Sequence, residues 1–315
     1  MKLHCIPILS ALFTSLVCFS NPATKISDNS PSSGIVIRWN DCEQTIDGFG
    51  IAQAGWAKEL FAFKNRKQVM DKMFGNDGLR LNILRGEIFP HYWENKEDKD
   101  FNLNDDINIE LCDSDFNNKS DDLLRRGQLW LTLEAKNKYH INKLVFSTWS
   151  APAWMKSNGK VSNGKLKPEC YQDFANYLAA FYKAYKSKGI TPYAISPSNE
   201  PGYAAPWNSS LWTADEMGKF ITSNLGPTFQ KENIPAKIIF GENPLWSVVM
   251  PQLKMVSSKD FTDTILQDYP EIKKFNLIAA GHGYSLSPDI MPIKVDKEYL
   301  KTPIIPFDAA EKAHI

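Results

Sequence analysis

The stretch Tyr193-Ala-Ile-Ser-Pro-Ser-Asn-Glu200-Pro201 decides the fold, because it joins a short apolar run to a rigid polar end. The residues up to Ile195 predict a buried strand, while Pro197 and Pro201 cannot donate to a neighbouring strand and fix the backbone around the acid. A carboxylate held beside an amide at the carboxyl end of a strand is typical of the working face of an α/β barrel. The stretch therefore predicts a strand that ends in a functional acid, Glu200, rather than in an ordinary polar loop.

The overall composition argues against a charged macromolecular partner. The chain has 315 residues, of which 43% are hydrophobic, enough for one large core or two modest ones. Lys+Arg and Asp+Glu each number 36, so the formal net charge is zero and nothing in it indicates nucleic acid or an anionic membrane as a partner. The 9 Trp, 11 Tyr and 18 Phe fill a core, but flat rings in loops are also good platforms for sugars.

The start of the chain predicts export. Residues 1–20 combine a basic start, a short apolar run and small residues, which together indicate a signal peptide. The run is too short to span a bilayer, so we expect no transmembrane segment and a secreted or extracytoplasmic protein. Lipid anchoring at Cys18 is the alternative. Residues 21–34 are typical of a linker.

Three cysteines follow the predicted signal peptide, Cys42, Cys112 and Cys170. An odd number in an exported protein allows at most one disulfide and leaves one thiol over, and the sequence leaves open whether any of them pair. Their spacing indicates no metal site. No glycine-rich phosphate-binding turn is present either, so we expect neither a metal nor a cofactor.

Residues 46–315 alternate apolar strand patterns with helical ones. A lone strand at 35–39 comes first, and later runs predict strands at 79–85, 143–149, 193–195, 236–242 and 276–284. Long or motif-rich loops occur only after strands, which favours a TIM barrel over a doubly wound sheet. Together with the segment Gln44–Gly50, where the alternation begins, these five runs give six strands in the barrel, against the eight that closure requires. We therefore predict an incomplete (β/α)8 TIM barrel of about six β/α units.

Two helices carry clear signals. One has an aromatic stripe of helical period that we interpret as core rather than as a cofactor site, made of Phe174, Leu178, Phe181 and Tyr185. Another begins at the capping box Thr213-Ala-Asp-Glu216 and is predicted to continue to Leu225.

Polar and aromatic residues recur at or just after the ends of the predicted strands. In a barrel these side chains converge on one pocket mouth. They are Arg85, Trp149, Asn199, Glu200, Glu242, His282 and Tyr284. The chain has no Ser-His-Asp order and no metal-ligand spacing, whereas carboxylates and aromatics are abundant. That combination suits cleavage of glycosidic bonds, which needs a proton donor, a nucleophile or base, and flat surfaces for sugar rings.

Three motifs give a specific resemblance. Asp47-Gly-Phe-Gly50, Trp149-Ser-Ala-Pro-Ala-Trp-Met-Lys-Ser-Asn-Gly159 and Ile195-Ser-Pro-Ser-Asn-Glu-Pro201 resemble glycoside hydrolase family 30, from about Ile35 onward. The resemblance implies a retaining β-glycosidase acting on a polysaccharide or glycoside, with a (β/α)8 barrel and an attached β-sandwich. Residues 35–45 would then be the N-terminal strand of that sandwich. Relatives act on glucosylceramide, on β-1,6-linked glucans or galactans, or on glucuronoxylan, and the sequence does not choose among them.

The resemblance also implies roles for single residues. Glu200 matches the acid/base glutamate after strand four, and Asn199 matches the residue that contacts the sugar 2-hydroxyl. Arg85 matches the arginine that holds the nucleophile ionised. The sugar-binding subsite is matched by Trp149, His282 and Tyr284. From the residues alone, a barrel-interior ion pair for Arg85 and core packing for Trp149 remain alternatives.

Other groups near the predicted strand ends have open roles. Glu87 and Glu242 are predicted to be hydrogen-bonding or ion-pair residues, with a principal catalytic role as the alternative. Trp154, Trp207 and Trp212 are either sugar platforms or loop anchors.

The chain departs from the family pattern near its end. The nucleophile is expected as a glutamate at the tip of strand seven, beyond residue 315, and Glu311 is not assigned this role because it precedes the expected strand. We therefore expect the chain as given to be an inactive fragment of a family member. A carbohydrate-binding remnant without catalysis, and a rearranged site in which Glu242 is the second carboxylate, are the alternatives.

Overall fold

The computed structural model describes residues 46–53, 56–93, 95–97, 127–246 and 256–283, together with the backbone of 304–305. The predicted signal peptide, linker and sandwich strand all lie outside the described residues. So do four single residues of the sequence analysis: Cys42, Cys112, Tyr284 and Glu311.

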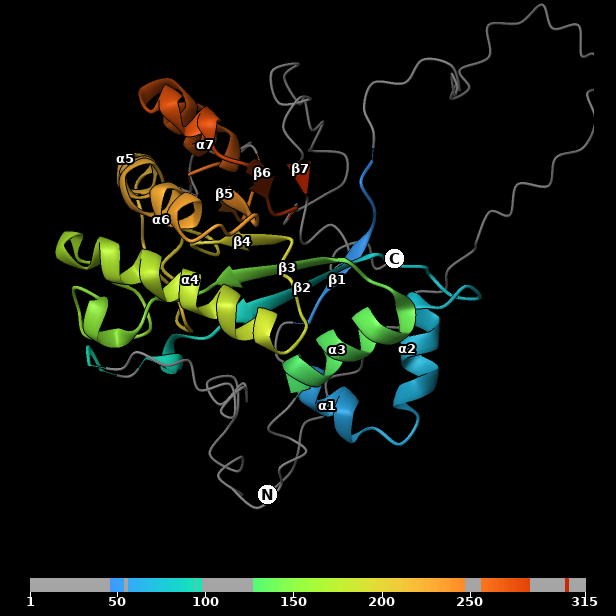
Figure 1. Ribbon diagram of the computed structural model, residues 1–315. Coiled ribbons are helices and arrows are strands. Elements are labelled where there is room, and N and C mark those ends of the chain that lie inside the picture. Colours follow the sequence, from blue (N-terminus) through green and yellow to red (C-terminus); the bar gives the residue numbers. More distant parts are fainter. Residues whose placement is uncertain are drawn as a thin grey trace, which may run out of the picture.

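The described chain forms one parallel sheet with its strands in sequence order (Figure 1). The strands are β1 Gly50–Ala52, β2 Ile83–Ile88, β3 Lys143–Thr148, β4 Ala194–Ser196, β5 Lys237–Asn243, β6 Leu277–Gly281 and β7 Ile304–Ile305. The α-helices are α1 Ala57–Ala62, α2 Arg66–Phe74, α3 Gly127–Tyr139, α4 Tyr171–Ser187, α5 Ala214–Phe220, α6 Gly226–Lys231 and α7 Ser258–Asp268. Short 3₁₀ turns lie at Pro90–Tyr92, Ala153–Met155, Pro168–Cys170 and Pro270–Lys274.

The prediction of an incomplete barrel is confirmed, but the strand count needs a correction. Seven strands are described rather than six, because β7 pairs in parallel with β6. Strand seven therefore precedes Glu311, whereas the sequence analysis expected it to follow that residue. Two isoleucines between Pro303 and Pro306 are too short a run to show any period, which is why the pattern did not reveal this strand.

The β2 strand also lies later in the chain than predicted. It begins at Ile83 and continues to Ile88, so Arg85 sits in the middle of the strand and not at its carboxyl end. The alternating residues before it are excluded from the strand because Arg80 has a left-handed backbone, with φ of 52°.

The helices cover the outer face of the sheet, where the main core lies. Helix α3 contacts β2, and α7 contacts β5 and β6 (Figure 1). The aromatic stripe of α4 is buried as predicted, with Phe181 and Tyr185 packed edge-on against Phe146 of β3. Core packing is therefore confirmed for that stripe.

Helix α5 begins as its capping box predicts. The Thr213 hydroxyl accepts a hydrogen bond from the Glu216 amide at 3.1 Å, and the Glu216 carboxylate accepts one from the Thr213 amide at 2.8 Å. Leu225 lies on the same helical path, as predicted, because a π-helical segment, Ile221–Leu225, leads directly into α6. Helix α7 was not predicted, although Ser257 caps it in the usual way.

The inner face of the sheet carries a second, smaller apolar layer. Alternate residues of a strand point to opposite faces, so Leu84 and Phe146 face the helices while Ile83 and Val145 face inward. The complete inner layer is Ile83, Val145, Ala194, Ile239, Ile278 and Ala280. We call this inner layer the apolar floor. The next inward-facing residue of each strand, two positions further along the chain, lies beside it on the inner face.

Candidate active site

A polar layer follows the apolar floor, two residues further along the strands. Arg85 comes two residues after Ile83, and Ser147 and Ser196 stand in the same relation to Val145 and Ala194. The period of two puts their side chains on the inner face. All three side chains are buried, so their polar atoms must find partners within the protein.

Glu242 reaches this layer through an irregularity in β5. Simple alternation from Ile239 would point Glu242 toward the helices, but the register with β6 shifts between Gly241 and Asn243. Gly241 and Glu242 both have left-handed backbones, with φ of 95° and 42°. This bulge turns the carboxylate inward, onto the polar layer.

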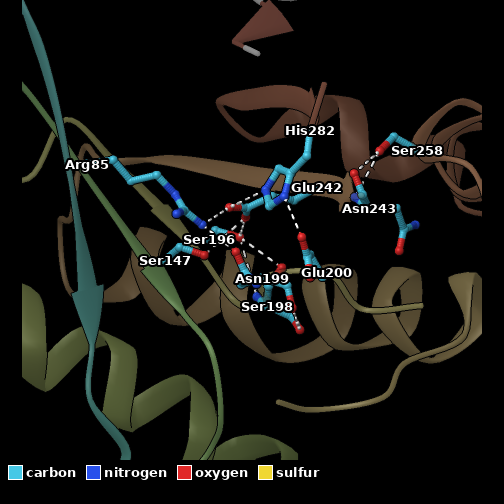
Figure 2. Close-up of polar contacts among 10 residues, drawn as sticks. All are labelled: Arg85, Ser147, Ser196, Ser198, Asn199, Glu200, Glu242, Asn243, Ser258 and His282. Atoms are coloured by element: carbon cyan, nitrogen blue, oxygen red, sulfur yellow. Dashed lines mark hydrogen bonds and ion pairs between the residues drawn. The ribbon is translucent and has the colours of Figure 1, made fainter. Parts of the chain in front are cut away.

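The Glu242 carboxylate is the centre of a buried charge cluster (Figure 2). The Arg85 guanidinium lies 2.5 Å from Oε1, and the hydroxyls of Ser147 and Ser196 both donate to Oε2, the former at 3.2 Å. Burial opposes ionisation of Glu242, but the Arg85 charge, His282 and the Ser196 hydroxyl outweigh it and lower the pKa of this carboxyl. Glu242 is therefore held as a carboxylate with no exposed surface.

Glu200 lies directly after β4, in a strained but well-fixed backbone. Its φ is 49°, and its amide donates to the Glu242 carbonyl at 3.0 Å. The preceding Asn199 donates from its amide to the Thr148 carbonyl at 2.7 Å, and its side-chain oxygen accepts from Arg85 at 2.6 Å. The ends of β3, β4 and β5 are thereby tied together under the Glu200 carboxylate.

His282 links the two glutamates. Its Nδ1 lies 2.9 Å from Glu200 Oε1 and its Nε2 lies 3.5 Å from Glu242 Oε1 (Figure 2). Its own amide donates to the Asn243 carbonyl at 2.9 Å, which fixes the end of β6 against β5. A protonated imidazole can donate to both carboxylates at once, whereas a neutral ring can donate to only one.

The structure brings together four of the predicted site residues: Arg85, Asn199, Glu200 and His282. Trp149 lies half-buried directly after β3, at the same edge of the sheet. Tyr284 lies outside the described residues, so its predicted role stays a prediction. Glu242 forms an ion pair with Arg85, which is the role that the sequence analysis predicted for it. Glu87 is buried near the end of β2.

The sequence analysis missed Ser147, Ser196 and Asn243. The two serines occupy the inward period of their strands, and that period could have revealed them once the apolar floor was recognised. Asn243 accepts a hydrogen bond from the Gly202 amide at 2.7 Å and so ties β5 to the loop after Glu200. Nothing in the sequence distinguishes that asparagine from any other.

The three tryptophans of uncertain role now separate. Trp212 is a core residue, 5% exposed and packed among Tyr171, Phe174 and Phe220. Trp154 is a loop anchor, since its indole donates to the Trp93 carbonyl. Trp207 remains exposed, at 45%.

Three further findings concern metal sites, membrane helices and cysteine in the described residues. Within the described ranges, no group of His, Cys, Asp or Glu side chains has the arrangement of a metal site. None of the helices described is both long and apolar enough to cross a membrane. Cys170 is a buried free thiol, and burial raises its pKa.

The chain is similar to known glycosidases. It is 30% identical over 251 residues to a putative glucosylceramidase 3 from Caenorhabditis elegans, which covers 76% of this chain and 45% of that protein. It is 28% identical over 237 residues to an endo-1,6-beta-D-glucanase from Neurospora crassa, which covers 70% of this chain and 45% of that protein. The chain thus spans less than half the length of these two relatives.

Two further comparisons concern the fold and the family. The fold resembles that of a solved endo-β1,6-glucanase, with a TM-score of 0.63 at 21% identity, over 83% of this chain and 57% of that one. The sequence profile of the glycosyl hydrolase family 30 TIM-barrel domain matches residues 46–274. That match covers well over half of the chain, and the chain therefore belongs to glycosyl hydrolase family 30.

Proposed function

We propose that the protein containing this chain hydrolyses β-linked glycans by a retaining double displacement, with Glu200 as the general acid and base. One observation carries the proposal: the Glu200 carboxylate stands at the carboxyl end of β4, fixed by His282 at 2.9 Å. In the first step Glu200 donates its proton to the glycosidic oxygen as the leaving group departs. In the second step it takes a proton from the water that releases the sugar.

The surrounding residues support this role. Asn199 is held in place by Arg85 and stands next to the acid, where the family assigns the contact with the sugar 2-hydroxyl. His282 orients the Glu200 carboxyl, and Trp149 is half-buried directly after β3, at the same edge of the sheet as the acid. Neutral hydroxyls and flat rings suit an uncharged pyranose.

The attacking carboxylate is the remaining requirement. Retaining enzymes hold it roughly 5–5.5 Å from the acid/base carboxyl. Glu242 is a poor nucleophile because it has no exposed surface and is held by Arg85, Ser147 and Ser196. We propose instead that the nucleophile is a glutamate outside the described residues, as the family pattern implies.

Location and substrate complete the proposal. The signal-peptide pattern of residues 1–20 supports an exported protein, with lipid anchoring at Cys18 as the variant form. The relatives include a putative glucosylceramidase, an endo-1,6-beta-D-glucanase and a glucuronoxylanase, and they support a β-linked glycan as the substrate class.

The test is chemical rescue of Glu200→Ala in the protein that contains this chain. We expect the rate of hydrolysis of natural glycans to fall by several orders of magnitude. Aryl glycosides with good leaving groups should still complete the first step, because their departure needs no proton donor. Added azide should then restore turnover by replacing the base-activated water. Glu134→Ala, on the distant helix α3, is the matched control. A Glu200→Ala protein as active as the parent on natural glycans would refute the assignment.

A carbohydrate-binding protein without catalysis is the second candidate. It is favoured by one observation: within the described residues, the other carboxylate joined to His282, Glu242, is sealed from solvent. Residues 1–315 that bind β-linked glycans without hydrolysing them would select this candidate for the chain as given.

A further inference from the structure

Two exposed aromatic residues, Tyr203 and Trp207, lie in the loop that follows Glu200. Within the described residues the large exposed hydrophobic side chains are Ile46, Phe49, Phe63, Leu79, Tyr203, Trp207 and Val256. Ile46, Phe49 and Leu79 precede β1 or β2, at the amino end of the sheet. Tyr203 and Trp207 belong instead to the loop that begins directly after Glu200. Val256 lies close to the start of this loop, because a Cβ built on Gly202 would lie 3.4 Å from its side chain.

From this we infer that Tyr203 and Trp207 form a binding surface for the sugar on the leaving-group side of the bond that is cleaved. The inference rests on the proposed function of Glu200. The two residues are 37% and 45% exposed, and their ring centroids lie 6.3 Å apart with the ring planes at 62°. They therefore touch each other at an angle while leaving ring surface open to a ligand.

The start of the loop is fixed relative to Glu200. The Tyr203 amide donates to the Glu200 carbonyl at 2.9 Å, and the Gly202 amide donates to Asn243 at 2.7 Å. The Trp212 amide donates to the Pro201 carbonyl at 2.9 Å and so closes the loop on itself. Tyr203 therefore has a set position relative to the acid.

The Trp207 end of the loop is fixed by the neighbouring loop after β3. The Ser209 amide donates to the Val161 carbonyl at 3.0 Å, and Lys156 donates to the Ser209 carbonyl at 2.6 Å. The Ser209 hydroxyl also donates to the Trp207 carbonyl at 3.2 Å. An exposed indole on a backbone held this firmly is pre-organised for binding, because little freedom is lost when a ligand arrives.

Chemistry places the loop on the leaving-group side. A general acid gives its proton to the oxygen of the departing group, so its carboxyl must face that group. The loop extends from the acid itself. A sugar is favoured over a lipid chain, because the segment that borders Trp207 is polar: Ser162 pairs with Asn208, and the Asn163 amide donates to Ser209. A lipid chain would require a continuous apolar groove.

The test compares ligands of different length. Binding is measured by calorimetry and by tryptophan fluorescence for glucose, for soluble β-1,6-linked gluco-oligosaccharides, for glucuronoxylo-oligosaccharides, and for phosphatidylcholine vesicles that contain glucosylceramide. The variants are Tyr203→Ala, Trp207→Ala, the double variant and the milder Trp207→Phe. Phe63→Ala removes a similarly exposed ring, 49%, that lies between α1 and α2, and is the matched control.

We expect the double variant to weaken binding of the oligosaccharide that the parent prefers by about tenfold, the effect of losing one or two ring contacts. Trp207→Phe should give a smaller loss, and glucose, which occupies only the other side of the bond, should bind unchanged. The control should behave as the parent does.

The outcomes separate this inference from the proposed function. A parent that binds none of these ligands refutes both. If the parent binds oligosaccharides and the double variant binds them equally well, the proposed binding surface of Tyr203 and Trp207 is refuted and the Glu200 assignment stays intact. Loss of vesicle binding alone would show that the rings receive a lipid, and would overturn the sugar assignment.

Discussion

Arg85 and Lys156 are two buried cations that are stabilised in opposite ways. Arg85, 5% exposed, lies 2.5 Å from the Glu242 carboxylate. Lys156 has no exposed surface, yet within the described residues it meets only neutral acceptors, the Ser150 hydroxyl at 3.1 Å and the Ser209 carbonyl at 2.6 Å. Burial accordingly lowers the pKa of Lys156 to about 8.

The difference matters for what each charge supports. Arg85 fixes Asn199, which precedes the acid, so a charge paired with a carboxylate holds the residues of the site. Lys156 joins the loop after β3 to the loop that carries Trp207, so an uncompensated charge holds a surface that the substrate is proposed to contact. Arg85 therefore belongs to a buried ion pair, whereas Lys156 makes a contact between two loops whose charge changes with pH.

The largest expected effect comes from breaking the compensated pair. Arg85→Met should lower the free energy of unfolding by about 3–5 kcal/mol, because it leaves the Glu242 carboxylate buried without its counterion. Urea unfolding followed by circular dichroism measures this. Arg80→Met, at an exposed position, is the control and should change stability by less than about 0.5 kcal/mol.

A double variant sharpens the same test. Arg85→Met with Glu242→Leu removes both charges and should recover a large part of the loss, since apolar replacements of a buried pair are often tolerated. If Arg85→Met alone costs less than about 1 kcal/mol, Glu242 is compensated by something other than Arg85 and the contrast with Lys156 fails.

The second effect is a change of pH dependence at Lys156. The pKa of the Lys156 amine is about 8 in the folded chain and 10.5 ordinarily. Between these two pH values the unfolded state therefore binds more protons than the folded state. Stability contributed by this site therefore rises with pH across that window. Lys156→Met removes the titration, and the stability of the parent relative to the variant should rise by about 3 kcal/mol over the window.

The control for Lys156 lies in the same loop. Lys160→Met changes an exposed lysine and should leave the slope of stability against pH as it is in the parent. Equal slopes for the parent and Lys156→Met would mean that the buried amine has a carboxylate partner after all.

Much of the barrel and part of the site could be predicted from sequence. Apolar runs revealed β3 and β5, and the Asn199-Glu200 pair marked the site, because motif residues and hydrophobic period are local properties. The β2 limits were wrong because left-handed Arg80 interrupts a run that looks like a strand. Arg85 nevertheless lies in the cluster with Asn199 and Glu242, while its predicted role toward the nucleophile stays a prediction.

The geometry of the charge cluster was beyond prediction, although ion-pair roles were named separately for Arg85 and Glu242. Glu242 faces inward only because β5 has a bulge, and a bulge depends on the pairing with β6 rather than on the local sequence. Ser147 and Ser196 carry no signal apart from the period of their strands. Pairing of Arg85 with Glu242 joins residues 157 positions apart, which no local pattern encodes.

The smallest predicted effect separates the two serines of the cluster. Both hydroxyls donate to Glu242 Oε2, but the Ser196 bond is among the main causes of the lowered pKa of that carboxyl, whereas the Ser147 bond is longer, at 3.2 Å. Ser196→Ala should therefore cost about 1–2 kcal/mol and Ser147→Ala about half as much, measured by urea unfolding at neutral pH. Because a carboxyl with a lowered pKa stabilises the fold above its ordinary value of 4.5 and loses that contribution as pH falls, the Ser196→Ala deficit should shrink in acid. A larger loss for Ser147→Ala, or a Ser196→Ala deficit that grows in acid, would mean that the arginine alone keeps Glu242 ionised and that the hydroxyls only fill space.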